Sequence, residues 1–246
     1  MSLLLLLFCG TLYAAAPASP QPAIVVIPVA DVWSRPLVNG EPPTDDLRET
    51  QVLNGEKVLI HESSGAWVRI EAPAQQEFTH HGIWEGYPGW VLAASLSLKP
   101  QSQKETYRPP EDILQFAESK KGLPYCWGGM STTCGFDCSG LVHLAYRTHG
   151  LEIPRDAHEQ WMKAKSILRT QLKPADLIFS AKAVAPKKIT HVALYAGDGM
   201  IIEAPQTGMV VRKISFKDKY GKNLSEVESG DRVGDRIIYF GTFQNH

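Results

Sequence analysis

Several features that mark particular classes of protein are missing from this sequence. Its 246 residues carry a formal net charge of −1, so the basic excess that nucleic-acid or anionic-membrane binding requires is absent. No apolar run reaches the length of about 20 residues that a helix needs to span a bilayer. No internal repeat or low-complexity tract is evident either. With 43% apolar and 21% charged residues, the composition is that of a globular protein with one large domain or two small ones.

The chain begins with a short apolar segment. Leu3 to Phe8 is an unbroken apolar run, and the small residues Ala14 to Ala16 follow it. This order is typical of a secretory signal with its cleavage region, which we place at residues 1–18. No Lys or Arg precedes the run, so a disordered apolar N-terminus is the alternative. The signal predicts an exported protein, periplasmic or extracellular.

Cysteine is rare, with four residues in the chain: Cys9, Cys126, Cys134 and Cys138. Removal of the signal would leave the last three, and an odd number in an exported protein indicates one free thiol. Cys126 and Cys134 are either joined by a disulfide or both reduced. The spacing of the cysteines lacks the paired C-x-x-C pattern of a structural zinc site. We therefore predict no metal site, and no motif requires an organic cofactor.

Residues 24–98 carry the pattern of a small all-β domain. Short apolar runs alternate with turn residues such as Asn54-Gly55. The runs are Ile24–Val29, Val52–Ile60, Trp67–Ile70 and Gly89–Leu92. Short strands with regular turn signals predict a β-barrel or sandwich, and the more polar segment from Ala72 to Tyr87 is expected to form a loop or an extended hairpin. Residues 99–109, rich in Gln, Ser, Lys and Pro, are the predicted linker.

Residues 110–246 combine helical and strand patterns. One helix is predicted to start near Pro110 and to end near Gly122, and a second to span Cys138 to His149. Strands are predicted near residues 176–180, 190–196, 200–204 and 236–240. Helices followed by a mostly antiparallel sheet define an α+β domain.

Cys138 has the surroundings of a nucleophile. The run Asp137-Cys138-Ser139 follows a glycine-rich loop and precedes a segment with helical apolar periodicity, which places Cys138 at a helix N-terminus. The positive end of the helix dipole and the unpaired N–H groups favour a thiolate there and could hold an oxyanion. Asp and Ser as immediate neighbours argue against the alternative, a buried structural cysteine.

His191 is the predicted base. It begins an apolar strand that turns at Gly197-Asp198-Gly199 and returns as residues 200–204. If the loop consists of those three residues, Ala193 pairs with Glu203, and His191 and Glu203 are diagonal neighbours on one face of the sheet. Glu203 would then fix the tautomer of the imidazole. A two-residue loop would put the two side chains on opposite faces.

The other histidines are weaker candidates for this role. His143 points away from Cys138 on the predicted helix, and His149 lies about 16 Å further along its axis. His158, in a loop-like stretch, is the credible rival. The histidines of the first domain are predicted to lie at the surface: His61, His80 and His81.

Four segments of the second domain, in this order and spacing, resemble the NlpC-type cell-wall cysteine peptidases: Leu123–Gly129, Phe136–Val142, Ile153–Ala157 and Thr190–Gly197. The resemblance runs from about residue 110 to residue 240. Three segments of the first domain are similar to bacterial SH3-like domains, which often precede this catalytic domain: Trp33–Pro36, Trp67–Ile70 and Gly86–Val91.

The resemblance implies a papain-like α+β fold and hydrolysis of the bond between γ-D-glutamate and a diamino acid in peptidoglycan stem peptides or muropeptides. It maps the nucleophile onto Cys138 and the base onto His191, and it places Glu203 where the family commonly has histidine. The protein would act as a monomer without metal or cofactor. An amidase or acyltransferase on the same fold and a non-catalytic wall-binding protein are the alternative functions.

The resemblance also implies roles around the nucleophile. Tyr125 corresponds to a tyrosine that assists the oxyanion, while Asp137 and Ser139 correspond to substrate contacts in relatives that require a free N-terminal L-Ala. Arg155 and Asp156 match a segment that lines the cleft, although a helix cap or an ion pair would explain them equally well. The first domain would either bind wall peptide or narrow the cleft so that only small fragments enter. In some relatives with a narrowed cleft, an acidic residue of that domain contacts the amine.

Overall fold

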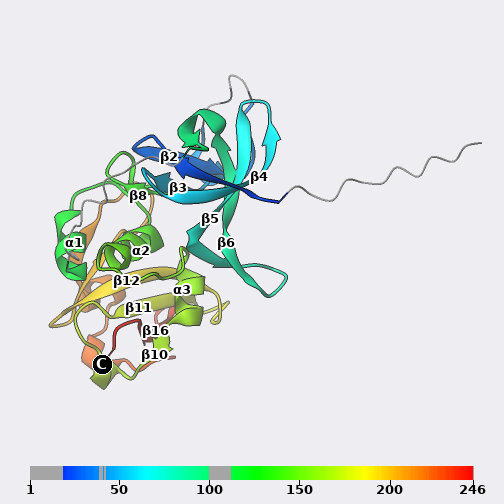
Figure 1. The fold of residues 1–246 in the computed structure, drawn as a ribbon. Helices are drawn as coiled ribbons and strands as arrows, with labels where there is room; N and C mark the ends of the chain where they lie inside the picture. The colour runs from blue at the N-terminus through cyan, green and yellow to red at the C-terminus, as the bar shows by residue number, and fades with distance from the viewer. Residues whose placement is uncertain (1–18, 39–40, 42, 100–111, 246) are drawn as a thin grey trace, which may run out of the picture.

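The computed structural model describes residues 19–38, 41, 43–99 and 112–245. Figure 1 shows an N-terminal part built from strands and a C-terminal part that combines helices with a sheet. The predicted signal at residues 1–18, the helix start near Pro110 and nearly all of the predicted linker lie outside the described residues. Within those residues, no helix is both long enough and apolar enough to cross a membrane.

The N-terminal part is an antiparallel sheet with its own core. In the order β3-β2-β6-β5-β4-β1-β7, it contains β1 (Gln21–Val25), β2 (Val29–Trp33), β3 (Arg48–Leu53), β4 (Lys57–Ser64), β5 (Trp67–Phe78), β6 (Trp84–Leu92) and β7 (Leu96–Ser97), with the 3₁₀ helices η1 (Asp45–Leu47) and η2 (Ala93–Ser95). Two predicted apolar runs, 24–29 and 52–60, are each divided by a turn. One of these turns uses the positive φ of Gly55 (83°). The similarity of this sheet to SH3-like domains stays a prediction.

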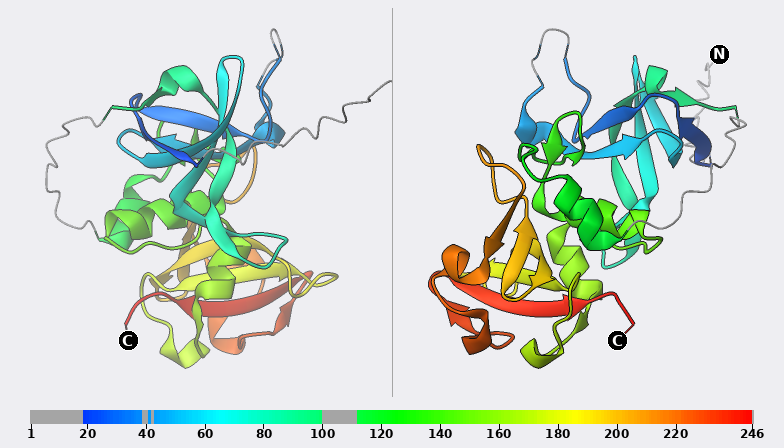
Figure 2. Two further views of the ribbon diagram at one scale, coloured as in Figure 1. Left: turned by 45° about the vertical axis from the view of Figure 1, so that its right-hand side comes forward. Right: turned by 90° about the vertical axis from the view of Figure 1, so that its left-hand side faces the viewer.

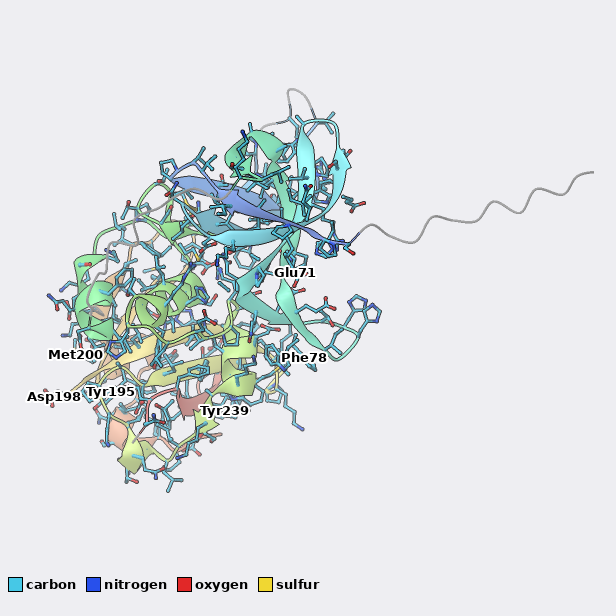
Figure 3. The ribbon with its side chains drawn as sticks, viewed as in Figure 1. Glu71, Phe78, Tyr195, Asp198, Met200 and Tyr239 are labelled. Atoms are coloured by element: carbon cyan, nitrogen blue, oxygen red, sulfur yellow. A yellow bond between two sulfur atoms is a disulfide. The ribbon has the colours of Figure 1, made fainter. Side chains whose placement is uncertain are left out.

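Strands β5 and β6 extend beyond the rest of the sheet as a hairpin arm. Of the two forms predicted for residues 72–87, the structure has the hairpin, with Phe78 opposite Trp84. Figure 3 labels Phe78 on this arm, beside the C-terminal part. There the backbone N–H of Arg155 donates to the carbonyl oxygen of Gln76 at 3.1 Å. The arm therefore connects the two parts directly.

The C-terminal part is an antiparallel sheet with helices packed on both faces. In the order β10-β16-β11-β12-β13-β14, with β15 beside β16, it contains β10 (Lys165–Ser166), β11 (Leu177–Lys182), β12 (Ile189–Gly197), β13 (Met200–Glu203), β14 (Arg212–Ser215), β15 (Arg232–Val233) and β16 (Arg236–Thr242). One face packs on α1 (Ile113–Ser119), α2 (Cys138–Thr148) and α3 (Ala157–Lys163). The other packs on α4 (Phe216–Tyr220) and η4 (Leu224–Glu226). Outside these layers lie β8 (Met130–Ser131), β9 (Gly135–Phe136) and η3 (Arg169–Gln171).

The sequence patterns located these elements well. The helix predicted for residues 138–149 is α2, and the four predicted strands are β11, β12, β13 and β16, so the α+β prediction is confirmed. Helix α1 begins at Ile113, where the carboxylate of Asp112 accepts the N–H of Gln115 at 2.9 Å. Figure 2 shows the green helices between the two sheets. Arg155 bonds both Asp137, which precedes α2, and Thr50 on β3, so the N-terminus of α2 is connected to both parts.

Candidate active site

Cys138 is the first residue of α2. The side chain of Asp137 caps this helix by accepting the N–H of Gly140 at 2.6 Å. A side chain at position 140 is excluded, because a Cβ there would lie 2.4 Å from the carbonyl oxygen of Gly129. This close approach of the helix to the preceding loop fixes the position of the Cys138 sulfur. The predicted helix N-terminus at Cys138 is confirmed.

The environment of Cys138 favours the thiol over the thiolate. Burial and the Asp137 carboxylate raise the pKa of Cys138 to about 12. Hydrogen bonds from the backbone N–H groups of Val192 and Ser139 act in the opposite direction. Since Val192 follows His191 on β12, the sulfur lies beside the strand that carries the predicted base. The thiolate therefore forms when a neighbouring base takes the proton.

Two adjoining hollows form a cleft at this position. Residues of both parts of the chain line the first, of about 470 Å³, and Cys138 is among them. The second, of about 560 Å³, contains His191. Tyr125 and Thr190 line both hollows. Cys138 therefore lines one hollow and His191 the other, with Tyr125 and Thr190 between them.

The hairpin of β12 and β13 brings His191 and Glu203 together. Its turn is the two-residue loop Asp198-Gly199, labelled at Asp198 in Figure 3, so the three-residue loop on which the contact was predicted is wrong. A β-bulge just before the turn shifts the pairing by one residue, and Leu194 lies opposite Ile202. The bulge thereby restores the register that the shorter loop would have lost. Nε2 of His191 lies 2.7 Å from Oε2 of Glu203.

Glu203 is buried and has two cationic partners besides His191. Its Oε1 accepts from Nη2 of Arg212 at 2.8 Å and from Nε at 3.1 Å, and its Oε2 accepts from Nζ of Lys219. Burial opposes ionisation of Glu203, but the hydrogen bond from His191 and the charge of Lys219 outweigh it and lower its pKa to about 2. Glu203 is therefore a carboxylate near neutral pH and can only accept hydrogen bonds.

The charge of Glu203 determines the tautomer of His191. A carboxylate has no proton to donate, so the 2.7 Å contact requires a hydrogen on Nε2 of His191. In the neutral ring, Nδ1 then carries no hydrogen, and its lone pair can accept a proton from a thiol. Burial lowers the pKa of His191, Glu203 opposes this effect and Lys219 adds to it. The imidazole of His191 is consequently uncharged before the thiol proton is transferred to it.

Arg155 does not line the cleft. Its fully buried guanidinium binds both carboxylate oxygens of Asp137, at 2.8 and 3.1 Å, and its Nη1 also donates to the hydroxyl of Ser139 at 3.1 Å. Of the two interpretations of Arg155, the structure favours the ion pair. Asp137 is held by this pair and by its helix cap, and it also lines the hollow that contains Cys138, so its contact with a substrate amine stays a prediction.

Four of the predicted oxyanion or substrate-binding residues line the hollow that contains Cys138: Tyr125, Asp137, Ser139 and Asp156. The carboxylate of Asp156 accepts the hydroxyl of Tyr87 at 2.9 Å, and burial raises its pKa to about 6. Glu49, on β3, lines the same hollow, and burial together with Asp156 raises its pKa. Sequence patterns could not assign Glu49, because nothing near it in the chain distinguishes it from a surface glutamate.

Of the rival histidines, His158 lines the hollow that contains Cys138, and His143 does not. His143 is buried, its Nδ1 lies 3.0 Å from the carbonyl oxygen of Ile153, and burial lowers its pKa to about 3. His158 lies in the first turn of α3, which corrects the predicted loop. Its Nδ1 accepts the N–H of Ile189 at 3.4 Å and its ring stacks on Trp161. Among the residues that the structure describes, no carboxylate is paired with His158, in contrast to His191. Among the described residues, no group of three or more His, Cys, Asp or Glu could hold a metal ion.

A disulfide joins Cys126 and Cys134, whose Cα atoms are 5.9 Å apart. The bridge stabilises the loop that leads to α2. The first domain contacts both sulfurs, with Nη1 of Arg48 3.2 Å from Cys126 and Nε2 of Gln51 3.3 Å from Cys134. Cys138 is the free thiol among the residues that the structure describes.

The Cys138 thiol is free and accepts from the N–H of Val192, next to a histidine that a carboxylate orients. These groups are the types that a cysteine peptidase uses. Residues 122–228 match the sequence profile of the NlpC/P60 family, and the chain carries an NlpC/P60 domain. Over 245 aligned positions it is 29% identical to γ-D-glutamyl-L-lysine dipeptidyl-peptidase of Bacillus subtilis (strain 168), covering 75% of this chain and 81% of that protein.

Two further comparisons concern the catalytic part and the fold. The chain is 40% identical over 131 residues to murein DD-endopeptidase MepH of Escherichia coli (strain K12), covering 52% of this chain and 48% of that protein. A crystal structure of an NlpC/P60 family protein from Bacillus cereus has a TM-score of 0.68 at 24% identity, covering 79% of this chain and 94% of that chain. The fold is therefore shared across most of both chains.

Proposed function

We propose that this protein is a peptidoglycan peptidase that cleaves the bond between γ-D-glutamate and a diamino acid in stem peptides. The observation that carries the proposal is Cys138 at the N-terminus of α2, hydrogen-bonded to the N–H of Val192, the residue that follows the base of the His191–Glu203 pair. The similarity to a B. subtilis protein named for the γ-D-glutamyl-L-lysine bond supports it, because that similarity covers 75% of this chain.

In the proposed reaction, Nδ1 of His191 takes the thiol proton of Cys138 as the sulfur attacks the γ-glutamyl carbonyl carbon. The backbone N–H groups of the first turn of α2 and the hydroxyl of Tyr125 stabilise the oxyanion. The imidazolium then gives its proton to the leaving amine, and a thioester remains. Water hydrolyses the thioester, which releases the glutamate carboxyl group and restores the thiol. Glu203 holds the ring orientation throughout.

The acidic wall of the cleft supports recognition of a free amino terminus. Glu49 and Asp156 line the hollow that contains Cys138, and both have raised pKa values. An ammonium group between two carboxylates would relieve their repulsion and form charge-assisted hydrogen bonds. The substrate would then be a freed fragment with an unblocked L-Ala, and Glu49 would be the contact that the first domain provides.

Mass spectrometry of L-Ala-γ-D-Glu-diaminopimelate after incubation with the protein tests the proposal, with Cys138→Ala as the blank. We expect free diaminopimelate and L-Ala-γ-D-Glu, and no cleavage of the N-acetylated peptide. The peptide with lysine in the third position tests which diamino acid is preferred. Cleavage of the acetylated peptide would contradict the amine requirement. No cleavage of any peptide, with a Cys138 that alkylates like an ordinary thiol, would overturn the peptidase proposal in favour of wall binding.

Glu49→Gln is expected to raise KM for the free-amine peptide about tenfold, because one charge-assisted hydrogen bond worth about 1.5 kcal/mol is lost. For wild type, KM should rise as the pH falls below about 6, because protonation of Asp156, whose pKa is about 6, removes the charge that binds the ammonium. The matched control is Glu85→Gln, which changes an exposed carboxylate on β6 and should leave KM unchanged. Equal KM values for Glu49→Gln and Glu85→Gln would contradict the role of Glu49.

A further inference from the structure

Lys219 has no role in the proposed mechanism, yet it lies against both members of the His191–Glu203 pair. It belongs to the short helix α4, and only 15% of its side chain is exposed. Its Nζ contacts Oε2 of Glu203 and lies 3.1 Å from Nε2 of His191. The ammonium therefore occupies the same edge of the imidazole that the carboxylate holds.

The contact between Lys219 and His191 is not an ordinary hydrogen bond. Nε2 of His191 carries the hydrogen that it donates to Glu203, and an ammonium group has no lone pair to accept it. Two donors thus face each other across 3.1 Å, held together by the carboxylate that they share. Protonation of the ring would place a second positive charge at this distance, which Coulomb repulsion opposes.

We propose that Lys219 is a positioning residue that keeps His191 neutral until the ring receives the thiol proton. This inference rests on the proposed function of Cys138 and His191. Together with Arg212, Lys219 also holds Glu203 in the orientation that keeps the hydrogen on Nε2. As a consequence, His191 stays unprotonated in mildly acidic solution. A histidine beside a carboxylate that has no cationic partner would be protonated there.

Other ionisable groups around His191 come from several elements. Besides Glu203 and Lys219, they are Cys138 on α2, Lys182 on β11, Arg212 on β14, Tyr220 on α4, and Asp235 with Arg236 at the start of β16. Asp235 and Arg236 contact each other at 3.6 Å, and Arg212 contacts the far oxygen of Glu203. Within this set, Lys219 is the cation that contacts the imidazole ring of His191 directly.

Lys219→Met removes the charge and keeps an unbranched side chain of similar length. We expect the pKa of His191, followed by NMR of its imidazole, to rise by about 1 unit, the lower end of the shift that a nearby charge produces. Two pH profiles should shift with it: that of kcat/KM and that of the rate at which iodoacetamide alkylates Cys138. The acidic side of each profile should move to higher pH by the same amount. Lys219→Arg should restore the wild-type profile. Lys217→Met, on the same helix but lining a different hollow, should leave it unchanged.

An unchanged His191 pKa in folded Lys219→Met protein would overturn the proposal, and a lower melting temperature without a pKa change would show that Lys219 is structural only. If Lys219→Met does not fold, Lys219→Gln, which keeps a donor to Glu203, provides the same comparison. NMR and alkylation need no peptide. Failure of the proposed function would therefore appear in the peptide assay alone, and failure of this inference in the titration.

Discussion

Replacing Cys138 with alanine is expected to lower kcat/KM for the stem peptide by about 10⁴-fold or more, which corresponds to about 5.5 kcal/mol of transition-state stabilisation. The substitution removes the atom that forms the thioester. The neighbouring hydroxyl of Ser139 cannot replace it, because it is buried and accepts a hydrogen bond from Arg155 at 3.1 Å. The measurement is the rate of release of the diamino acid, with enzyme in excess so that slow turnover is detected.

The matched control for this variant is Cys126→Ala/Cys134→Ala, which removes the other two cysteines of the catalytic domain. Loss of their disulfide is expected to cost about 2–3 kcal/mol of stability, because the bridge closes a short loop in the unfolded chain. The nucleophile remains, so the folded fraction should still release product. Activity of Cys138→Ala within about 100-fold of wild type would contradict the assignment of the nucleophile.

The position of Cys138 could be predicted from the sequence because its determinants are local. The cap Asp137, the small residue Gly140 and the apolar positions of the helix all lie within a few residues of the sulfur. The contact between His191 and Glu203 was less certain, because it depends on how the turn closes. The glycine-rich segment 197–199 permits either loop length, and the bulge that restores the register has no clear sequence signal.

Contacts between residues far apart in the chain could not be predicted in this way. Lys219 reaches His191 across 28 positions, and Arg155 reaches Thr50 across 105. Both Lys219 and Arg155 are long charged residues, a type that is mostly exposed in proteins. Their burial follows from the packing of α4 and α3 against the rest of the molecule, which no local pattern encodes. For the same reason the sequence could suggest an acidic contact from the first domain but could not identify Glu49.

Arg155→Met is expected to lower the free energy of unfolding by about 3–5 kcal/mol, the usual result of breaking a buried ion pair. The guanidinium binds Asp137, and its Nε donates to the hydroxyl of Thr50 at 2.8 Å. That hydroxyl donates in turn to Gln75 at 2.7 Å. Methionine replaces the apolar stem but leaves the carboxylate of Asp137 without its cation. Urea denaturation monitored by circular dichroism measures this decrease in the free energy of unfolding.

The matched control for Arg155→Met is Arg169→Met, which breaks a surface pair with Glu228 whose side chains are 28% and 55% exposed. Arg169→Met should lower the free energy of unfolding by no more than about 1 kcal/mol. The double variant Asp137→Asn/Arg155→Met should lose less than the sum of the single variants, because a neutral amide is cheaper to bury than an unpaired carboxylate. Equal losses in the two arginine variants would mean that solvent reaches Asp137. Since the network joins the cap of the nucleophile helix to Thr50 of the first domain, Arg155→Met should also reduce kcat of the folded protein.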